Sequence, residues 1–68
     1  MNRKYKICII IPCYNEGTRF QKKEYSNFLL SNKNTLICFV NDGSTDDTLE
    51  LLYDLKSEFF TQIEILSF

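Results

Sequence analysis

Apolar residues gather in three short runs along the chain, and mixed polar segments separate them. The runs 7–11 and 35–40 are continuous and rich in β-branched residues, which predicts strands buried on both faces of a parallel sheet. Pro12 has no N–H to donate to a ladder, so we expect the first strand to end there. The third run, 62–66, alternates and carries Glu64, which favours a strand nearer a sheet edge.

The two segments between the runs have helical periodicity. Segment 19–31 is predicted to be helical in its second half, where an apolar stripe has the spacing i, i+3, i+4: Tyr25, Phe28 and Leu29. In the second segment the apolar positions also follow a helical period: Leu49, Leu52, Tyr53 and Phe59. Ser44 and Asp47 at its start match a capping box, and Asp46 suits the positive end of a helix dipole. We therefore expect Ser44, Asp46 and Asp47 to cap this helix.

The predicted order of elements is β-α-β-α-β, which defines the α/β class. Two right-handed crossovers in one direction would then give a parallel sheet with strand order 3-2-1, half of a doubly wound Rossmann-like sheet. This order leaves the first strand at the edge, although its sequence is that of a buried strand. An open apolar edge promotes aggregation. We therefore expect the sheet to be incomplete, with another strand beside the first in a larger domain.

Composition and charge exclude several classes of function. The 68 residues carry eight Lys plus Arg against nine Asp plus Glu, so no basic excess points to nucleic acid. No apolar run approaches the roughly 20 residues that span a bilayer. With no export signal, a cytoplasmic location is expected, and membrane association of a full-length protein is the alternative. The three cysteines are expected to be reduced, and without His they do not form a zinc site.

Two polar loops follow the first two strands, at the edge of the sheet where α/β folds bind ligands. In loop 12–17, Tyr14 offers a ring on which a base can stack, and Glu16 offers a carboxylate. Loop 41–44 contributes Asp42. Neither loop has a G-x-G-x-x-G or P-loop pattern, which argues against ordinary dinucleotide and P-loop sites. Each residue also has a plainer interpretation, because Tyr14 can anchor a loop and Asp42 can belong to an ordinary turn.

The segments 9–16 and 39–48 carry a family resemblance. Their apolar-Pro-x-Tyr-Asn-Glu and Asp-Gly-Ser-x-Asp-x-Thr elements resemble the opening of family 2 glycosyltransferases. That resemblance implies the GT-A fold, a nucleotide-activated sugar as donor and, commonly, a divalent metal. Gly17, Arg19 and Phe20 are similar to the branch of polyprenyl- and dolichyl-phosphate sugar transferases.

The resemblance implies a role for four residues of this sequence. Pro12 would shape the loop over the base, Tyr14 would pack on the uracil or guanine ring, and Glu16 would lie near the nucleoside. Asp42 would bond to the base edge. The donor would be a UDP-sugar, with a GDP-sugar as the alternative. Asn41 occupies a position where the family often has Asp, so a role that needs a carboxylate there is not supported.

The family's later motifs are not found in these 68 residues. Its Asp-x-Asp metal motif and its catalytic base follow later strands, so Mg²⁺ or Mn²⁺ is expected for the complete domain, without ligands in this chain. Residues 1–68 are then the N-terminal nucleotide-sugar-binding part of a glycosyltransferase domain, without catalytic residues and inactive alone. The alternative function is a non-enzymatic α/β binding or assembly module that pairs, or self-associates, through its open sheet edge.

Overall fold

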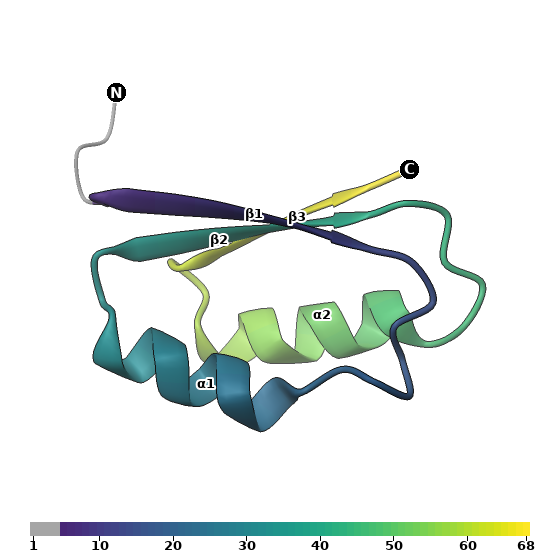
Figure 1. The fold of residues 1–68 in the computed structure, drawn as a ribbon, viewed down its shortest axis with the longest axis horizontal. Helices are drawn as coiled ribbons and strands as arrows, with labels where there is room; N and C mark the ends of the chain where they lie inside the picture. Colours follow the sequence, from purple (N-terminus) through teal and green to yellow (C-terminus); the bar gives the residue numbers. More distant parts are fainter. Residues whose placement is uncertain (1–4) are drawn as a thin grey trace.

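The computed structural model of the chain describes residues 5–68. Three strands form one parallel sheet in the order β1-β2-β3, and a helix connects each strand to the next (Figure 1). The β-α-β-α-β order and the predicted strand order 3-2-1 are therefore confirmed. The elements along the chain are β1 (Ile7–Cys13), α1 (Lys22–Ser31), β2 (Thr35–Asn41), α2 (Thr48–Glu58) and β3 (Ile63–Ser67).

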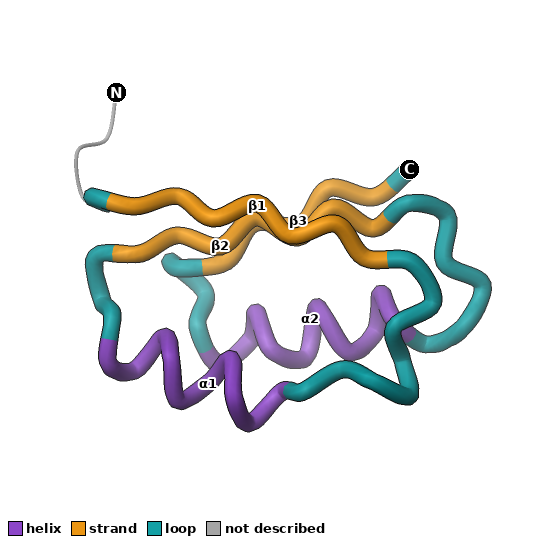
Figure 2. Tube along the Cα trace, viewed as in Figure 1, coloured by secondary structure: helices purple, strands orange, loops and turns teal. Residues whose placement is uncertain are grey.

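Both helices cover the same face of the sheet, below the strands in Figures 1 and 2. In β2 the buried positions therefore alternate with half-buried ones, beginning with buried Thr35 and ending with buried Asn41. On the uncovered face Ile10 of β1 is 68% exposed and Leu66 of β3 is 51% exposed. The prediction that the first two strands are buried on both faces is wrong for residues 5–68, because both crossovers run in the same direction along the sheet and place both helices on one side.

Pro12 does not end β1, which continues to Cys13. The carbonyl of Cys13 accepts a hydrogen bond of 3.0 Å from the Asp42 amide, so Cys13 faces β2. Neighbouring residues of a strand point their backbone groups to opposite sides, and Pro12 therefore faces the outer edge of the sheet. The missing N–H costs no ladder bond there, which is why the strand tolerates the proline.

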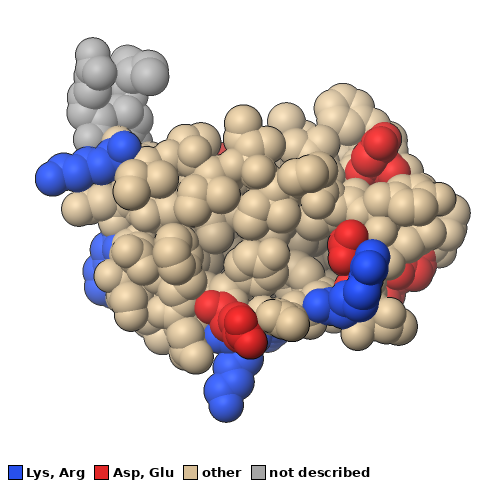
Figure 3. All heavy atoms as spheres, in the orientation of Figure 1, with Lys and Arg blue, Asp and Glu red and all other residues tan. Residues whose placement is uncertain are grey.

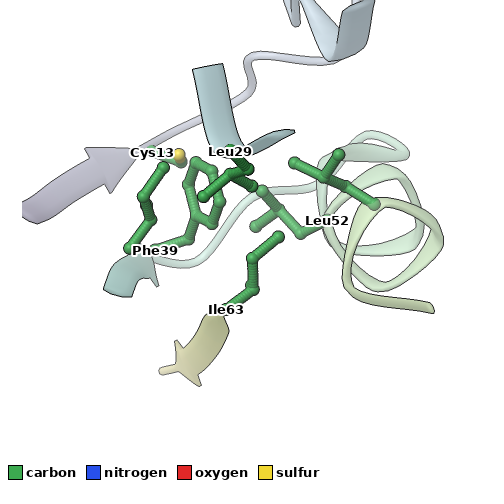
Figure 4. Packing of buried hydrophobic residues seen from close by; sticks show 7 residues of the cluster. Cys13, Leu29, Phe39, Leu52 and Ile63 are labelled. Atoms are coloured by element: carbon green, nitrogen blue, oxygen red, sulfur yellow. The ribbon is translucent and has the colours of Figure 1, made fainter. Parts of the chain in front are cut away.

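One apolar layer between the sheet and the helices forms the core. Figure 4 shows its side chains pointing toward one another from β1, β2, β3 and both helices. Phe39 of β2 lies at its centre with no exposed surface, and the rings of Phe20 and Tyr25 approach it edge-on, with centroids 6.0 and 5.2 Å away. This layer fixes the positions from which the loops at the carboxyl end of the sheet begin.

The predicted apolar stripes are correct in part. On α1, Leu29 is fully buried and Tyr25 is half-buried, as predicted, but Phe28 is 39% exposed. On α2, Leu52 is fully buried, whereas Tyr53 is exposed and Leu55 is buried in its place. The difference on α2 arises because Tyr53 matches the helical spacing but lies at the border of the apolar stripe, where its ring does not enter the core.

The side chain of Gln62 joins three parts of the chain just before β3. Its Nε2 atom faces three carbonyl oxygens at the end of α1 and the start of β2. The distances are 3.4 Å to Leu29 O, 3.0 Å to Asn32 O and 3.2 Å to Thr35 O. The backbone amides of Asn32 and Thr35 also donate to the carbonyls of Leu29 and Asn32, so Gln62 adds a side-chain donor to this junction.

Neither helix of residues 5–68 is long and apolar enough to cross a membrane. All three cysteines lie in this range and are free thiols, as predicted. Cys13 is buried and Cys38 is half-buried, but Cys8 is exposed on the uncovered face of the sheet.

Candidate functional site

The two loops predicted to carry the chemistry lie side by side beyond the carboxyl ends of β1 and β2 (Figure 1). The bond between the Asp42 amide and the Cys13 carbonyl brings the ends of the two strands together. Tyr14, the next residue after Cys13, and Asp42 therefore leave the sheet at neighbouring points of one rim. Both side chains are exposed there, and Tyr14 is 58% exposed.

Three consecutive backbone amides of the first loop donate hydrogen bonds to three side chains of the segment that joins β2 to α2 and of the first residue of that helix. We call this set, formed by the amides of 15–17 and the side chains of Ser44, Asp46 and Thr48, the inter-loop clasp. Its bonds run from Asn15 N to Ser44 Oγ (2.9 Å), from Glu16 N to Thr48 Oγ1 (2.8 Å) and from Gly17 N to Asp46 Oδ2 (3.0 Å). The two motifs of the sequence thus hold each other in place.

The conformation of the first loop depends on Asn15 and Gly17. Asn15 adopts a positive φ of 48°, a left-handed conformation that Asn tolerates better than most residues. Its Oδ1 atom also accepts a bond of 2.8 Å from the Thr45 amide. Gly17 has no room for a side chain, because a Cβ atom there would lie 2.2 Å from Asp47 Oδ1 and 2.9 Å from Asp46 Oδ2. Any larger residue at 17 would have to displace these carboxylates.

The predicted capping box is wrong. α2 begins at Thr48, and Asp47 at its N-cap makes no side-chain cap bond. The hydroxyl of Ser44 is used by the first loop instead. Asp46 accepts bonds from the amide of Thr48 at 2.9 Å and from its hydroxyl. The Thr48 hydroxyl, followed by the Thr48 and Gly17 amides, lowers the pKa of Asp46 below its usual value, so this carboxylate is ionised at neutral pH.

A pocket of about 190 Å³ opens beside the first loop. Pro12 and Glu16 line it, whereas Tyr14 and Asp42 lie outside it on the exposed rim. The structure thus divides the four predicted residues between the pocket and the rim. The remaining lining residues are Ile11, Cys13, Arg19, Phe20, Gln21 and Tyr25.

Sequence reasoning missed Arg19 as a part of this site. Its guanidinium pairs with the Glu16 carboxylate at 3.2 Å, and its amide bonds to the Glu16 carbonyl at 2.9 Å. The spacing i, i+3 of opposite charges is the signal that could have indicated this pair. It was missed because the segment between the loop and α1 has no clear periodicity.

The rim is acidic. The loops carry four carboxylates, on Glu16, Asp42, Asp46 and Asp47, and the guanidinium of Arg19 lies beside the first. Figure 3 shows acidic side chains gathered at this end of the molecule, while the middle of the same face is largely uncharged. Carboxylates accept bonds from N–H and O–H groups and repel phosphates. The rim is therefore suited to a base edge or a ribose hydroxyl.

A divalent metal does not fit the described part of the chain. Within residues 5–68 no group of three or more His, Cys, Asp or Glu side chains is arranged to hold a metal ion. Asp46 in particular has its oxygens engaged by the inter-loop clasp and by Thr48. No step of a reaction is therefore assigned to a metal held by these residues.

Comparisons with known proteins agree with the geometry. The model of the family described as glycosyl transferase family 2 matches residues 8–68. A Bacillus subtilis protein named as a glycosyltransferase, CsbB, is 40% identical over 68 positions, which cover 91% of this chain and 20% of that protein. A poly-beta-1,6-N-acetyl-D-glucosamine synthase of Staphylococcus epidermidis is 38% identical over 50 positions, 74% of this chain and 12% of that protein.

The chain therefore spans only about a fifth of the first of these relatives and about an eighth of the second. No solved structure gives a significant match. The family model covers both loops, both helices and all of the three strands except Ile7. This chain belongs to glycosyl transferase family 2.

Proposed function

We propose that the chain binds the nucleotide of a UDP-sugar donor and serves as the nucleotide-binding part of a glycosyltransferase. The observation that carries the proposal is the pairing of the two loops, which sets Tyr14 and Asp42 on one rim. Tyr14 presents an exposed ring on which a base can stack, and Asp42 can accept the N–H of the base edge. Glu16, in the adjoining pocket, can accept a ribose hydroxyl.

For both the donor and the acceptor we propose one preferred substrate and one alternative. The proposed nucleoside is uridine, and a GDP-sugar is the alternative donor. Gly17, Arg19 and Phe20 support an acceptor such as a polyprenyl phosphate. The Staphylococcus epidermidis relatives, whose names describe synthesis of a β-1,6-linked N-acetylglucosamine polymer, support a growing polysaccharide as the alternative acceptor.

Glycosyl transfer needs groups that we assign to other parts of a complete domain. Mg²⁺ or Mn²⁺ would offset the charge of the nucleotide diphosphate, and a base would activate the acceptor. We therefore propose that residues 1–68 alone bind a nucleotide but transfer no sugar. The three free thiols support a reducing compartment such as the cytoplasm.

Nucleotide titration tests this function directly. We expect uridine to shift the backbone NMR signals of Tyr14 and Asp42, and to bind at least as tightly as UDP without divalent cations, because the acidic rim repels the diphosphate. Mg²⁺, which binds phosphates, should narrow that difference. Tyr14→Ala and Asp42→Ala are each expected to weaken uridine binding about tenfold, from lost stacking or a lost acceptor.

Tyr53→Ala is the matched control, because Tyr53 is a similarly exposed tyrosine on α2. It should leave the affinity unchanged. GDP titration separates the two donors. A folded chain in which neither loop responds to uridine, UDP or GDP would contradict the proposed function.

A second function, as an assembly module, is favoured by the uncovered sheet face. Ile10 and Leu66 are exposed on it, and the outer edge of β1 has no strand beside it within residues 5–68. Such faces and edges promote association.

Light scattering tests this second function. We expect the measured mass to rise above that of a monomer as the concentration increases, and we expect Ile10→Lys to abolish the rise. Leu30→Lys, at an exposed leucine of α1, should not. A wild-type chain that stays monomeric at every concentration would exclude this function.

A further inference from the structure

We propose that Thr48, the first residue of α2, is a positioning residue for the nucleotide, and that it acts through Glu16 without touching the ligand. The inference rests on the proposed function and deepens it. Thr48 has no exposed surface, so no ligand can reach it. The residue through which it acts, Glu16, lies in the pocket beside the rim.

The hydroxyl of Thr48 is held in one orientation. It donates its proton to Asp46 Oδ1, and the Thr48 amide bonds to the same oxygen at 2.9 Å. With the proton committed to Asp46, a lone pair of Oγ1 is left to accept the bond of 2.8 Å from the Glu16 amide. The hydrogen bond from the Glu16 amide to Thr48 therefore holds the backbone of Glu16 at a fixed place relative to the start of α2.

The packing of α2 in the core keeps Thr48 in place. Leu52 and Leu55, on the same helix, are fully buried in the core, so the helix cannot shift without disturbing the packing. The bond to Thr48 is the central one of the inter-loop clasp, between those of the Asn15 and Gly17 amides. Loss of the central bond should release the peptide that carries the Glu16 carboxylate, while the outer bonds keep the loops together.

Two substitutions at Thr48 separate positioning from packing. Thr48→Val keeps the shape of the side chain and removes the hydroxyl, whereas Thr48→Ser keeps the hydroxyl and removes a buried methyl group. We expect Thr48→Val to weaken uridine binding about tenfold and to speed hydrogen exchange of the Glu16 amide. Thr48→Ser should lower thermal stability but keep the affinity within about twofold of the wild type.

Thr35→Val is the matched control. Thr35 is also a buried threonine, but it lies at the amino end of β2, at the opposite end of the sheet from the loops. It should leave both the affinity and the Glu16 amide unaffected. All affinities are measured at a temperature where melting curves show every variant to be folded, so that unfolding does not mimic weak binding.

The outcomes are distinct. The inference is supported if Thr48→Val, which lacks the hydroxyl, loses affinity for uridine and Thr48→Ser, which has it, retains that affinity. If Thr48→Val binds uridine as tightly as the wild type, or Thr48→Ser loses as much affinity as Thr48→Val, the positioning role is overturned while the nucleotide function stands. A folded wild-type chain that binds no nucleotide overturns the proposed function and this inference together.

Discussion

Replacing Phe39 by alanine is expected to leave most of the chain unfolded at room temperature. Phe39 has no exposed surface and packs against the rings of Phe20 and Tyr25 at the centre of the core. Removal of a buried phenylalanine ring costs about 3–5 kcal/mol. A chain of about 60 residues buries only about 60% of its unfolded surface and has little stability to lose. Far-UV circular dichroism during urea titration measures the change.

Phe60→Ala is the control for this experiment, because Phe60 is 73% exposed. Its effect should stay within about 0.5 kcal/mol, apart from the loss of its contact with the Lys56 ammonium, 5.1 Å from the ring centroid. If Phe39→Ala unfolds at the same urea concentration as the wild type, the layer described here is not the core of the protein.

Gln62→Glu is expected to cost about 2–3 kcal/mol at neutral pH, although the side chain keeps its shape. The amide nitrogen that faces the carbonyls of Leu29, Asn32 and Thr35 would be replaced by a carboxylate oxygen. Three acceptors would then face another acceptor, and the end of α1 would lose one of its side-chain donors. Chemical denaturation of the variant and the wild type in parallel gives the difference in unfolding free energy.

The loss should depend on pH in a definite direction. Facing carbonyl oxygens favour the protonated carboxyl group, so the pKa of the carboxyl group introduced by Gln62→Glu should be higher in the folded than in the unfolded chain. The variant is then closest to wild-type stability below the unfolded pKa of about 4.3, and it loses stability as the pH rises through the folded value. Gln21→Glu, at the exposed start of α1, should show little change. A difference independent of pH would contradict the assigned contacts of Gln62.

The topology could be predicted from the sequence because it follows from few rules. Three apolar runs separated by helical segments predict parallel strands joined by right-handed crossovers, and two crossovers in the same direction give the order that the structure has. The same rules place the ends of β1 and β2 together. For this reason the sequence alone is enough to expect Tyr14 and Asp42 on one rim.

The errors arise where distant parts of the chain compete for the same group. Ser44 and Asp47 have the spacing of a local cap, but the Ser44 hydroxyl bonds to Asn15, 29 positions earlier in the sequence. A local pattern contains no information about that partner. Continuous apolar runs likewise show that a strand is suited to burial, and they do not show whether a layer covers its second face. The role of Arg19 depends on a turn of the loop that has no periodic signal.

The place of Pro12 on the outer side of β1 limits how another strand can join the sheet. Of the residues that alternation points outward, Cys8 and Ile10 retain an amide that an incoming backbone could use, whereas Pro12 has none. An added strand would therefore be anchored toward the amino end of β1. A strand added at this edge of the sheet would leave the rim with Tyr14 and Asp42 uncovered. The sheet could therefore gain a strand and bind a nucleotide at the same time.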